Sequence, residues 1–395
     1  MSRFLNPLLI GLAAALGWSV QATAQPAPVM RTGQLNCYDD NGRRTSCRGT
    51  GQDGELRFGT KSPAARFVDN RDGTVTDKLS NLTWLKNADC FKARQWEEGL
   101  ALIKALANGG CGLSDQSKAG EWRLSNIIEL QSLLDYGREG FALPRRHPFE
   151  NVSNGTYWTS TQSPAAPPLG WFMTLSIGPT VFDVKVNTFH LWPVKGGLGR
   201  DARLPKSGQN KCWAPFGNPI DCKGTGQDGE IQAGVAWPNP RFTDNRNGSV
   251  TDNLTGLVWL KDAHCLGFGD FGDSLRRSNR LADGQCGLTD RSRPGEWRLP
   301  NIRELQSLQS YATFAPDLPE GHPFLNVQPT LTWTSTSGAG FAAQAWFTIF
   351  GVGPTVFEDK SVPLAIWPVR GGNRVIDEND DRSGNDRDRE KETGR

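Results

Sequence analysis

The sequence repeats itself at a single offset of 175 residues. All eight cysteines and five tryptophans of each copy come into register at that offset, so the copies differ by substitution and by no net insertion. The aligned positions are Cys37/Cys212, Cys47/Cys222, Cys90/Cys265, Cys111/Cys286, Trp84/Trp259, Trp122/Trp297, Trp158/Trp333, Trp171/Trp346 and Trp192/Trp367. Solenoid repeats have periods of roughly 20–50 residues. The period found here therefore predicts two whole domains.

The repeat sets the expected domain boundaries. The first copy spans residues 34–197 and the second spans residues 209–372, each about 165 residues long and large enough for one core. We expect residues 198–208 to form a linker, because they hold Gly, Pro and basic residues and little that can pack. Residues 376–395 are almost entirely charged or small polar, which predicts a disordered tail.

The N-terminus is typical of a secretory signal peptide. Arg3 precedes a short apolar run from Leu8 to Val20, and Ala22 to Ala24 form a small-residue cleavage site. The apolar run is shorter than the ~20 residues of a spanning helix, and no cysteine follows it closely enough for a lipid anchor. We therefore expect residues 1–24 to be removed and the mature protein to be periplasmic, secreted or held at the cell surface.

Cysteine usage fits that compartment, because disulfides persist in oxidising environments. Four cysteines per copy allow three connectivities. We favour nearest neighbours, since Cys37 and Cys47 flank an Asp-Asn-Gly turn that brings strand ends together. The favoured pairs are Cys37–Cys47, Cys90–Cys111, Cys212–Cys222 and Cys265–Cys286. A structural metal site is the disfavoured alternative, because no CxxC pair or repeated histidine accompanies them.

Local patterns predict an α+β fold for each copy. Residues 96–107 carry apolar side chains at helical spacing. Asn126 and Asn301, each followed three residues later by Glu, predict capping boxes that start a second helix. Elsewhere, Gly- and Asn-containing turns separate short alternating segments that favour antiparallel strands. We expect two helices per copy, many short strands and disulfide staples.

Several motifs carry a family resemblance. The runs DNxxGxVTD, GEWRLPNIRELQSL, WTSTS, AWF and WPVRGG resemble the C-terminal domain of the Legionella collagen-like adhesin over nearly both copies. That resemblance implies a secreted or surface module that, in the adhesin, attaches to sulfated glycosaminoglycans. The WRLPN, WTST and closing RGG motifs are more distantly similar to the C-type-lectin-like fold of formylglycine-generating enzymes, which implies that fold for each copy.

The chain departs from these relatives in ways that matter. It has no collagen-like Gly-X-Y stretch, and the first copy has Ser125 where the motif has Pro. The EPN, QPD and WND sugar-binding signatures of lectins are absent, so a lectin-type calcium–sugar site is not carried over. All eight cysteines are accounted for as disulfides, so the reactive cysteines of formylglycine-generating enzymes have no counterpart. We assign no catalytic residues.

Candidate ligand-binding residues lie mainly in the second copy. Arginines cluster there, and bidentate pairing with sulfate or carboxylate would suit an acidic polysaccharide, although a solvated surface is the simpler alternative. Trp213 and Trp237 occur only in this copy, in turn-rich segments, and are expected to be exposed, whereas the five repeated tryptophans are expected to form core. The candidate arginines are Arg276, Arg277, Arg280, Arg291 and Arg293.

A second candidate is a calcium site at a repeated turn, because Asp and Asn supply oxygen donors and calcium takes 6–8 of them. The alternative is ordinary turn chemistry, in which these residues are favoured anyway. The residues concerned are Asp69, Asp72, Asp77, Asp244, Asn247 and Asp252.

The sequence therefore predicts a non-catalytic protein that binds an extracellular glycan or envelope component. A protein-interaction module of a periplasmic or surface assembly is the alternative, and an enzyme related to formylglycine-generating proteins is third. The net charge of +2 is too small to indicate nucleic-acid binding. We expect no obligatory cofactor apart from the calcium alternative.

Overall fold

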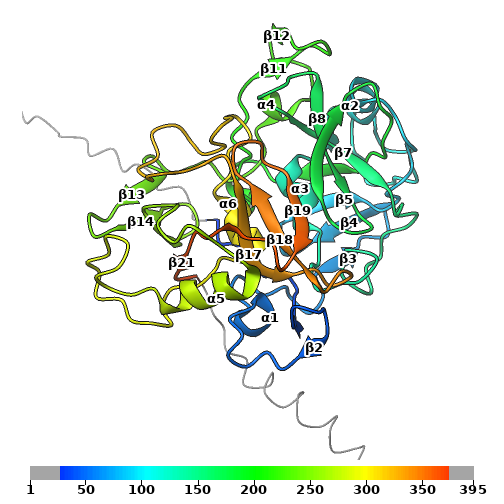
Figure 1. Cartoon of the computed structure of the whole chain (residues 1–395). Helices are drawn as coiled ribbons and strands as arrows, with labels where there is room; N and C mark the ends of the chain where they lie inside the picture. Colours follow the sequence, from blue (N-terminus) through cyan, green and yellow to red (C-terminus); the bar gives the residue numbers. More distant parts are fainter. Residues whose placement is uncertain (1–26, 373–395) are drawn as a thin grey trace, which may run out of the picture.

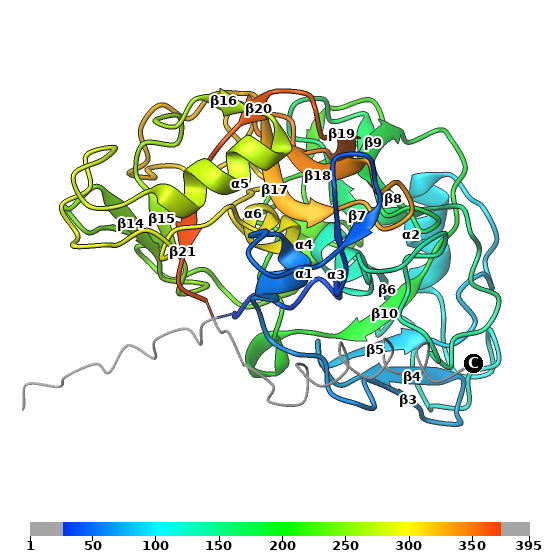
Figure 2. The same ribbon diagram turned by 60° about the horizontal axis from the view of Figure 1, so that its bottom comes forward.

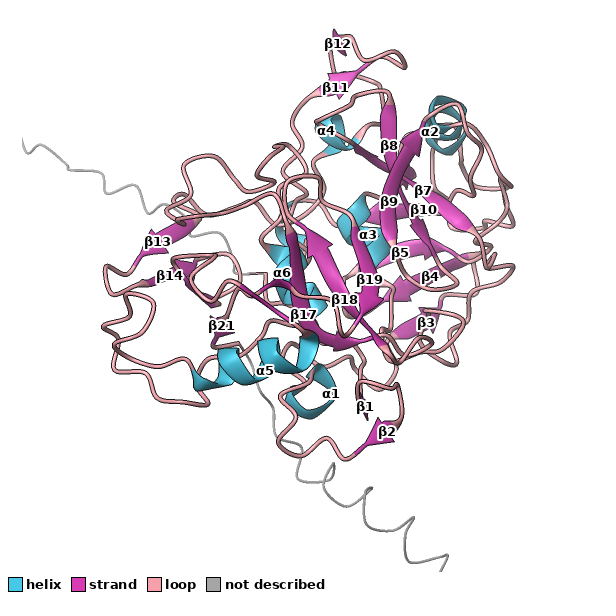
Figure 3. Cartoon of the chain, viewed as in Figure 1, coloured by secondary structure: helices cyan, strands magenta, loops and turns pink. Residues whose placement is uncertain are grey.

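The computed structural model describes residues 27–372, and strands outnumber helices throughout (Figure 3). The signal peptide and the charged tail predicted from the sequence lie outside the described residues. The helices are α1 (Asp53–Leu56), α2 (Trp96–Lys104), α3 (Ile127–Ser132), α4 (Asp228–Ile231), α5 (Phe271–Arg280) and α6 (Ile302–Ser307), with a 3₁₀ turn η1 (Gly199–Asp201).

The strands of the first copy are β1 (Cys37–Tyr38), β2 (Arg44–Thr45), β3 (Phe67–Asp69), β4 (Thr74–Asp77), β5 (Leu82–Leu85), β6 (Arg123–Leu124), β7 (Thr156–Gln162), β8 (Leu169–Thr174), β9 (Thr180–Val184) and β10 (Pro193–Gly196). Those of the second copy are β11 (Cys212–Trp213), β12 (Pro219–Ile220), β13 (Phe242–Asp244), β14 (Ser249–Asp252), β15 (Val258–Leu260), β16 (Phe268–Gly269), β17 (Leu331–Ser337), β18 (Gln344–Ile349), β19 (Thr355–Asp359), β20 (Leu364–Ala365) and β21 (Val369–Arg370).

One sheet of eight strands joins the two copies. Its order is β16-β20-β17-β18-β19-β9-β8-β7, so strands of the second copy continue directly into strands of the first. The junction is antiparallel and pairs Thr180 with Thr355, which are equivalent positions of the repeat. The copies are therefore related by an approximate twofold axis that passes through the sheet. Each copy also has a smaller sheet, β3-β4-β5-β10-β6 in the first and β13-β14-β15-β21 in the second.

Aromatic residues close the same junction on both sides of the axis. Trp171 packs edge-on against Tyr311 with ring centroids 5.3 Å apart, and its counterpart Trp346 packs against Tyr136 at 5.2 Å. Such T-shaped pairs add about 0.5–1.5 kcal/mol to the burial of the rings themselves. The two copies therefore form one continuous body.

The N-terminal hairpin segments are exchanged between the copies. Segment 34–61, which contains β1, β2 and α1, packs on the second copy, and the equivalent segment with β11, β12 and α4 packs on the first (Figure 1). Gln34 donates its side-chain amide to the carbonyl of Ser337 at 2.9 Å. The buried amine of Lys360 likewise donates to the carbonyls of Tyr38 and Asp39, at 3.2 and 3.1 Å. Each folded half is therefore completed by chain from the other repeat.

The exchange involves the linker as well. Ala202, Leu204 and Ser207 are buried, and Leu204 belongs to the core of the first half. The expectation that residues 198–208 have little to pack is therefore wrong, because these residues run between the halves and fill space there. Segment 27–33 takes the equivalent path, and Met30 lies in the same core as Leu204.

Several expectations from the sequence are confirmed inside each half. The repeated tryptophans are all buried, and the four disulfides join nearest-neighbour cysteines. Asn126 and Asn301 form complete capping boxes with Glu129 and Glu304. The fold is α+β, with the two expected helices per copy and a third, single-turn helix, α1 or α4, that the repeat pattern did not predict.

A buried carboxyl group anchors each exchanged segment. Asp53 accepts hydrogen bonds from Thr32 at 2.6 Å and from Thr336 of the second copy at 2.8 Å. Asp228 accepts one from Thr161 of the first copy at 2.7 Å. Burial raises the pKa of both carboxyl groups to about 6. The hydrogen bonds from hydroxyl groups lower the pKa, but their effect is smaller than that of burial. Both groups therefore hold their protons in the folded state at pH values where an unfolded chain would release them.

This pKa shift predicts how stability depends on pH. Between about pH 4 and pH 6 the folded state binds more protons than the unfolded state, so stability falls as the pH rises and stays low above pH 6. The double substitution Asp53→Asn/Asp228→Asn keeps the acceptor oxygens and removes the titration. We expect it to raise the free energy of unfolding at pH 7 by about 2–3 kcal/mol per site and to have little effect at pH 4.

Urea unfolding followed by tryptophan fluorescence at pH 4, 5, 6 and 7 measures the difference. The substitution Asp72→Asn, at a turn where the side chain is only partly buried, is the matched control and should show no such trend. An equal effect of the double substitution at every pH would contradict the assignment of buried, protonated carboxyl groups.

Candidate binding surface

The exchange places a helix of one copy against a hairpin of the other at each end of the molecule. Helix α5 faces the segment of β1 and β2, and helix α2 faces the segment of β11 and β12 (Figure 1). Gly51 lies next to Leu275: a Cβ added to Gly51 would be 3.9 Å from that side chain, which is ordinary van der Waals contact. Gly226 lies next to Leu100 in the same way. Each end therefore presents a composite surface made by both repeats.

Three of the candidate arginines lie on α5. The helix begins at Asp270, whose carboxylate accepts the backbone N–H of Asp273 at 2.6 Å, and it buries Phe271 and Leu275. Arg276 and Arg280 are consequently on the outer face, one helical turn apart. Arg276 is 59% exposed and forms an ion pair with Asp273 at 3.5 Å.

Arg277 has a different environment. Its guanidinium donates to the backbone carbonyl of Phe268 at 2.9 Å and to that of Leu266, and it pairs with Asp273 at 3.3 Å. These bonds fasten the loop before α5 to the helix. Arg277 therefore stabilises a loop of its own copy, whereas the side chains of Arg276 and Arg280 lie on the outer face of the helix.

Arg291 and Arg293 lie in a loop beside the C-terminal end of α5. The backbone N–H of Gly295 donates to the carbonyl of Asn279 at 2.7 Å, which holds the loop against the helix. Within residues 27–372, the exposed guanidinium groups of Arg280, Arg291 and Arg293 have no side-chain partner. We call Arg276, Arg280, Arg291 and Arg293 the α5 arginine surface. It brings four cations together, and the nearby carboxylates include those of Asp273, which pairs with Arg276, and Asp283, which accepts the backbone N–H of Arg291.

The equivalent surface on the first copy has a different chemistry. Ala101 and Ala105 stand where Arg276 and Arg280 stand in the second copy. Helix α2 and the hairpin of β11 and β12 enclose a groove of about 460 Å³, which Leu100, Lys104 and the half-buried Trp213 help to line. Lys104 donates to the carbonyl of Gly224 at 2.8 Å across this groove. Trp213 therefore lies at the opposite end of the molecule from the α5 arginine surface.

Trp237 supports the linker. Its indole N–H donates to the carbonyl of Lys206 at 3.1 Å, its ring covers Gly208, and the guanidinium of Arg241 lies 4.5 Å from the ring centroid. These contacts leave the ring half-buried. Trp237 therefore has a structural role in the second copy, which is to support the linker. The structure brings neither Trp237 nor Trp213 to the arginine cluster.

The Asp and Asn side chains proposed for calcium have protein partners. Asp77 forms a bidentate ion pair with Arg66, with distances of 2.9 and 2.7 Å, and Asp252 pairs with Arg241. Asp69 and Asp244 each form an ion pair with a lysine, which lowers their pKa together with a backbone hydrogen bond. The side chains of Asp72 and Asn247 each accept a hydrogen bond from the backbone N–H group two residues further along the chain. Among the described residues no group of three or more His, Cys, Asp or Glu side chains is arranged to hold a metal ion.

The glutamates and histidines that stand at equivalent positions of the two copies also contact other residues of the protein. Glu304 accepts two hydrogen bonds from Arg298, each 2.6 Å long, in addition to its capping role, and Glu129 is held in the same way by Arg123. The rings of His147 and His322 pack near Phe149 and Phe324, and partial burial lowers their pKa. Their Nδ1 atoms are buried and have no hydrogen-bond partner among the described residues.

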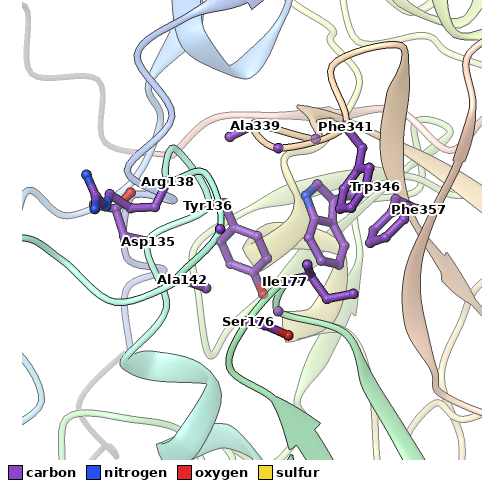
Figure 4. Close-up of a pocket in the computed structure, with 14 residues that line it drawn as sticks. Asp135, Tyr136, Arg138, Ala142, Ser176, Ile177, Ala339, Phe341, Trp346 and Phe357 are labelled. Atoms are coloured by element: carbon purple, nitrogen blue, oxygen red, sulfur yellow. The ribbon is translucent and has the colours of Figure 1, made fainter. Parts of the chain in front are cut away.

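A small cavity lies at the junction of the two copies (Figure 4). Tyr136 and Trp346, which pack against each other, line it together with Ile177 and Phe357, and its volume of about 20 Å³ has room for about one water molecule. This cavity is too small for an organic ligand. The open α5 arginine surface is the better candidate.

The class of protein that these features define is a two-copy, disulfide-bonded module of mixed α+β structure, and the four disulfides favour an extracytoplasmic location. Comparison with protein families shows that the chain belongs to the Lcl C-terminal domain family. The family model matches residues 73–195 and 248–370, which together make up more than half of the chain. The resemblance to the C-terminal domain of the collagen-like adhesin is therefore confirmed.

Neither the curated proteins nor the solved structures gave a match. The exchanged hairpin segments lie outside both matched ranges. Over residues 27–372, no helix combines the length and apolar character needed to span a membrane.

Stability measurements can separate binding arginines from structural ones. Arg298 is buried, pairs with Glu304 and covers the ring of Phe58 from the exchanged segment at 3.7 Å. Arg298→Ala leaves Glu304 as an unpaired buried charge, so we expect a loss of about 3–5 kcal/mol. Arg276→Ala/Arg280→Ala removes only exposed groups, and we expect a change within about 0.5 kcal/mol. Chemical denaturation measures both, and a large loss in the second variant would show that the α5 arginine surface is structural.

Proposed function

We propose that this protein binds an acidic, sulfated extracellular glycan at the α5 arginine surface, without catalysis. The observation that carries the proposal is the set of exposed guanidinium groups along one helix face and the adjoining loop, of which only Arg276 has a side-chain partner among the described residues, the carboxylate of Asp273 at 3.5 Å. Guanidinium groups pair with sulfate or carboxylate oxygens through two parallel N–H donors, which gives both affinity and orientation. Membership of the Lcl C-terminal domain family supports a binding role.

A non-catalytic role is supported by the use of the polar groups. Every cysteine is in a disulfide, and the repeated glutamates are held in buried ion pairs with arginine. A nucleophile needs an adjacent base, and carboxylate pairs in hydrolases need access to substrate. A C-type-lectin-like fold for each half is part of the same proposal, based on the motif resemblance alone.

The alternative function is a protein-interaction module of a periplasmic or surface assembly. It is favoured by the exposed apolar side chains of Phe216 and Ile220, which are 87% and 42% exposed on the hairpin beside Trp213. Adjacent exposed apolar groups are typical of contact sites for another macromolecule. This surface is separate from the α5 arginine surface, so the two functions can be tested independently.

The test compares binding of the mature protein to immobilised heparin and to desulfated heparin. We expect binding only to the sulfated form and an affinity that falls with increasing salt concentration. Arg276→Ala/Arg280→Ala should weaken binding about tenfold and reduce the dependence on salt, since two charge-assisted contacts are lost.

The charge-matched control is Arg145→Ala/Arg146→Ala, which removes two exposed arginines of the first copy. The control should bind like the parent protein. Equal losses in both variants would indicate nonspecific attraction and contradict a defined site. Heparin binding that survives unchanged in both variants, but falls on Phe216→Ser, would place the glycan at the hairpin beside Trp213 and contradict the proposed site.

A further inference from the structure

Another concave surface lies where the linker passes the first copy. It is a groove of about 540 Å³ whose charged lining consists of Lys61, Lys78, Arg200, Asp201 and Arg203. We call this set the basic groove. Four cations and one carboxylate give it an excess of positive charge, and Met30 and Leu79 provide an apolar floor.

The cations come from three separate places in the fold. Lys78 follows β4, Arg200 lies in the 3₁₀ turn η1, and Arg203 belongs to the linker. All three are exposed, and in the described part of the chain none of them has an ion pair or a side-chain hydrogen bond. Because like charges at one groove repel each other, the arrangement favours an anionic occupant.

The described chain ends beside this groove. Gly372 shares a small hollow with Pro28 and Gly59, and Pro28 and the adjoining Thr60 also line the basic groove. A Cβ added to Gly372 would lie 3.4 Å from the ring of Phe58. Figure 2 shows the red end of the described chain after β21 meeting its blue beginning, close to the green turn of η1.

The sequence that follows Gly372 complements the groove in charge. Asp377-Glu378-Asn379-Asp380-Asp381 carries four carboxylates and no basic residue. It begins five residues beyond Gly372 and ends nine residues beyond, a reach of roughly 16–30 Å for an extended chain. Because the hollow that holds Gly372 and the basic groove share Pro28, a segment of that reach starts beside the groove.

We propose that residues 377–381 of the same chain dock in the basic groove, with their carboxylates paired to Lys78, Arg200 and Arg203. Attachment through a short connection gives the segment an effective concentration in the millimolar range, so a weak anionic site becomes occupied intramolecularly. The docked segment excludes other anions from this groove and leaves the α5 arginine surface free. This proposal does not depend on the proposed glycan function, because the two sites share no residue.

The test is zero-length carbodiimide cross-linking of the full mature chain, followed by peptide mass spectrometry of the monomeric fraction. We expect Lys78 to be joined to a carboxylate within residues 377–381, and the yield to fall as salt is added. Asp377→Asn/Glu378→Gln/Asp380→Asn/Asp381→Asn should abolish that cross-link. The matched control, Asp386→Asn/Asp388→Asn/Glu390→Gln/Glu392→Gln, makes the same charge change and should retain it.

A second measurement uses a fluorescent peptide of sequence Asp-Glu-Asn-Asp-Asp. We expect it to bind at least tenfold more tightly to the chain neutralised at 377–381 than to the parent chain, and Arg200→Ala/Arg203→Ala in the neutralised chain should remove that binding. Cross-links from residues 386–392 in equal yield, links only between different molecules, or equal peptide affinity for both chains would each overturn the proposal.

Discussion

The arrangement of this molecule depends on one buried contact made twice, between a carboxyl group in an exchanged segment and a threonine hydroxyl of the other copy. Asp53 meets Thr336 in one half and Asp228 meets Thr161 in the other. A buried acid is stable only when it is hydrogen-bonded and neutral or paired, and here burial raises the pKa of both groups to about 6. These contacts fix where the hairpin segments lie and therefore which helix each hairpin faces.

The exchange places a helix of one repeat beside a hairpin of the other repeat at each end of the molecule. Helix α5 belongs to the second copy, but the hairpin beside it belongs to the first, and the reverse holds for helix α2 and Trp213. Substitutions after duplication have given the two ends different chemistry. Arginines stand on α5 at the positions where α2 has alanines, and a mainly apolar groove that includes Trp213 lies at the α2 end. One scaffold thus presents a cationic surface and an apolar one at a fixed separation.

Local sequence signals were sufficient for most of the fold inside each half. Capping boxes at Asn126 and Asn301, the nearest-neighbour disulfides and the buried repeated tryptophans all follow from patterns that a few adjacent residues determine. The partner of each hairpin could not be predicted in this way. The two copies offer chemically equivalent docking sites, and a repeat pattern does not distinguish attachment to the same copy from attachment to the other.

The candidate site was predicted only in part. The outer-face arginines Arg276 and Arg280 follow from helical spacing, whereas the bonds of Arg277 to backbone carbonyls depend on a loop path that spacing does not specify. Trp237 was predicted to be exposed, but the linker that covers part of its ring is distant from any recognisable motif. The basic groove was missed because its cations come from three segments that meet only in the folded molecule.

The exchange itself can be tested by disulfide trapping. Gln52 and Ser337 are in contact, with the hydroxyl of Ser337 donating to the side-chain oxygen of Gln52 at 3.0 Å, and Gln162 is the position in the first copy that is equivalent to Ser337. Under mild oxidation, Gln52→Cys/Ser337→Cys should form an intramolecular disulfide that peptide mapping detects, while Gln52→Cys/Gln162→Cys should not. A 52–162 disulfide without a 52–337 disulfide would mean that each hairpin stays on its own copy, and would contradict the exchanged arrangement.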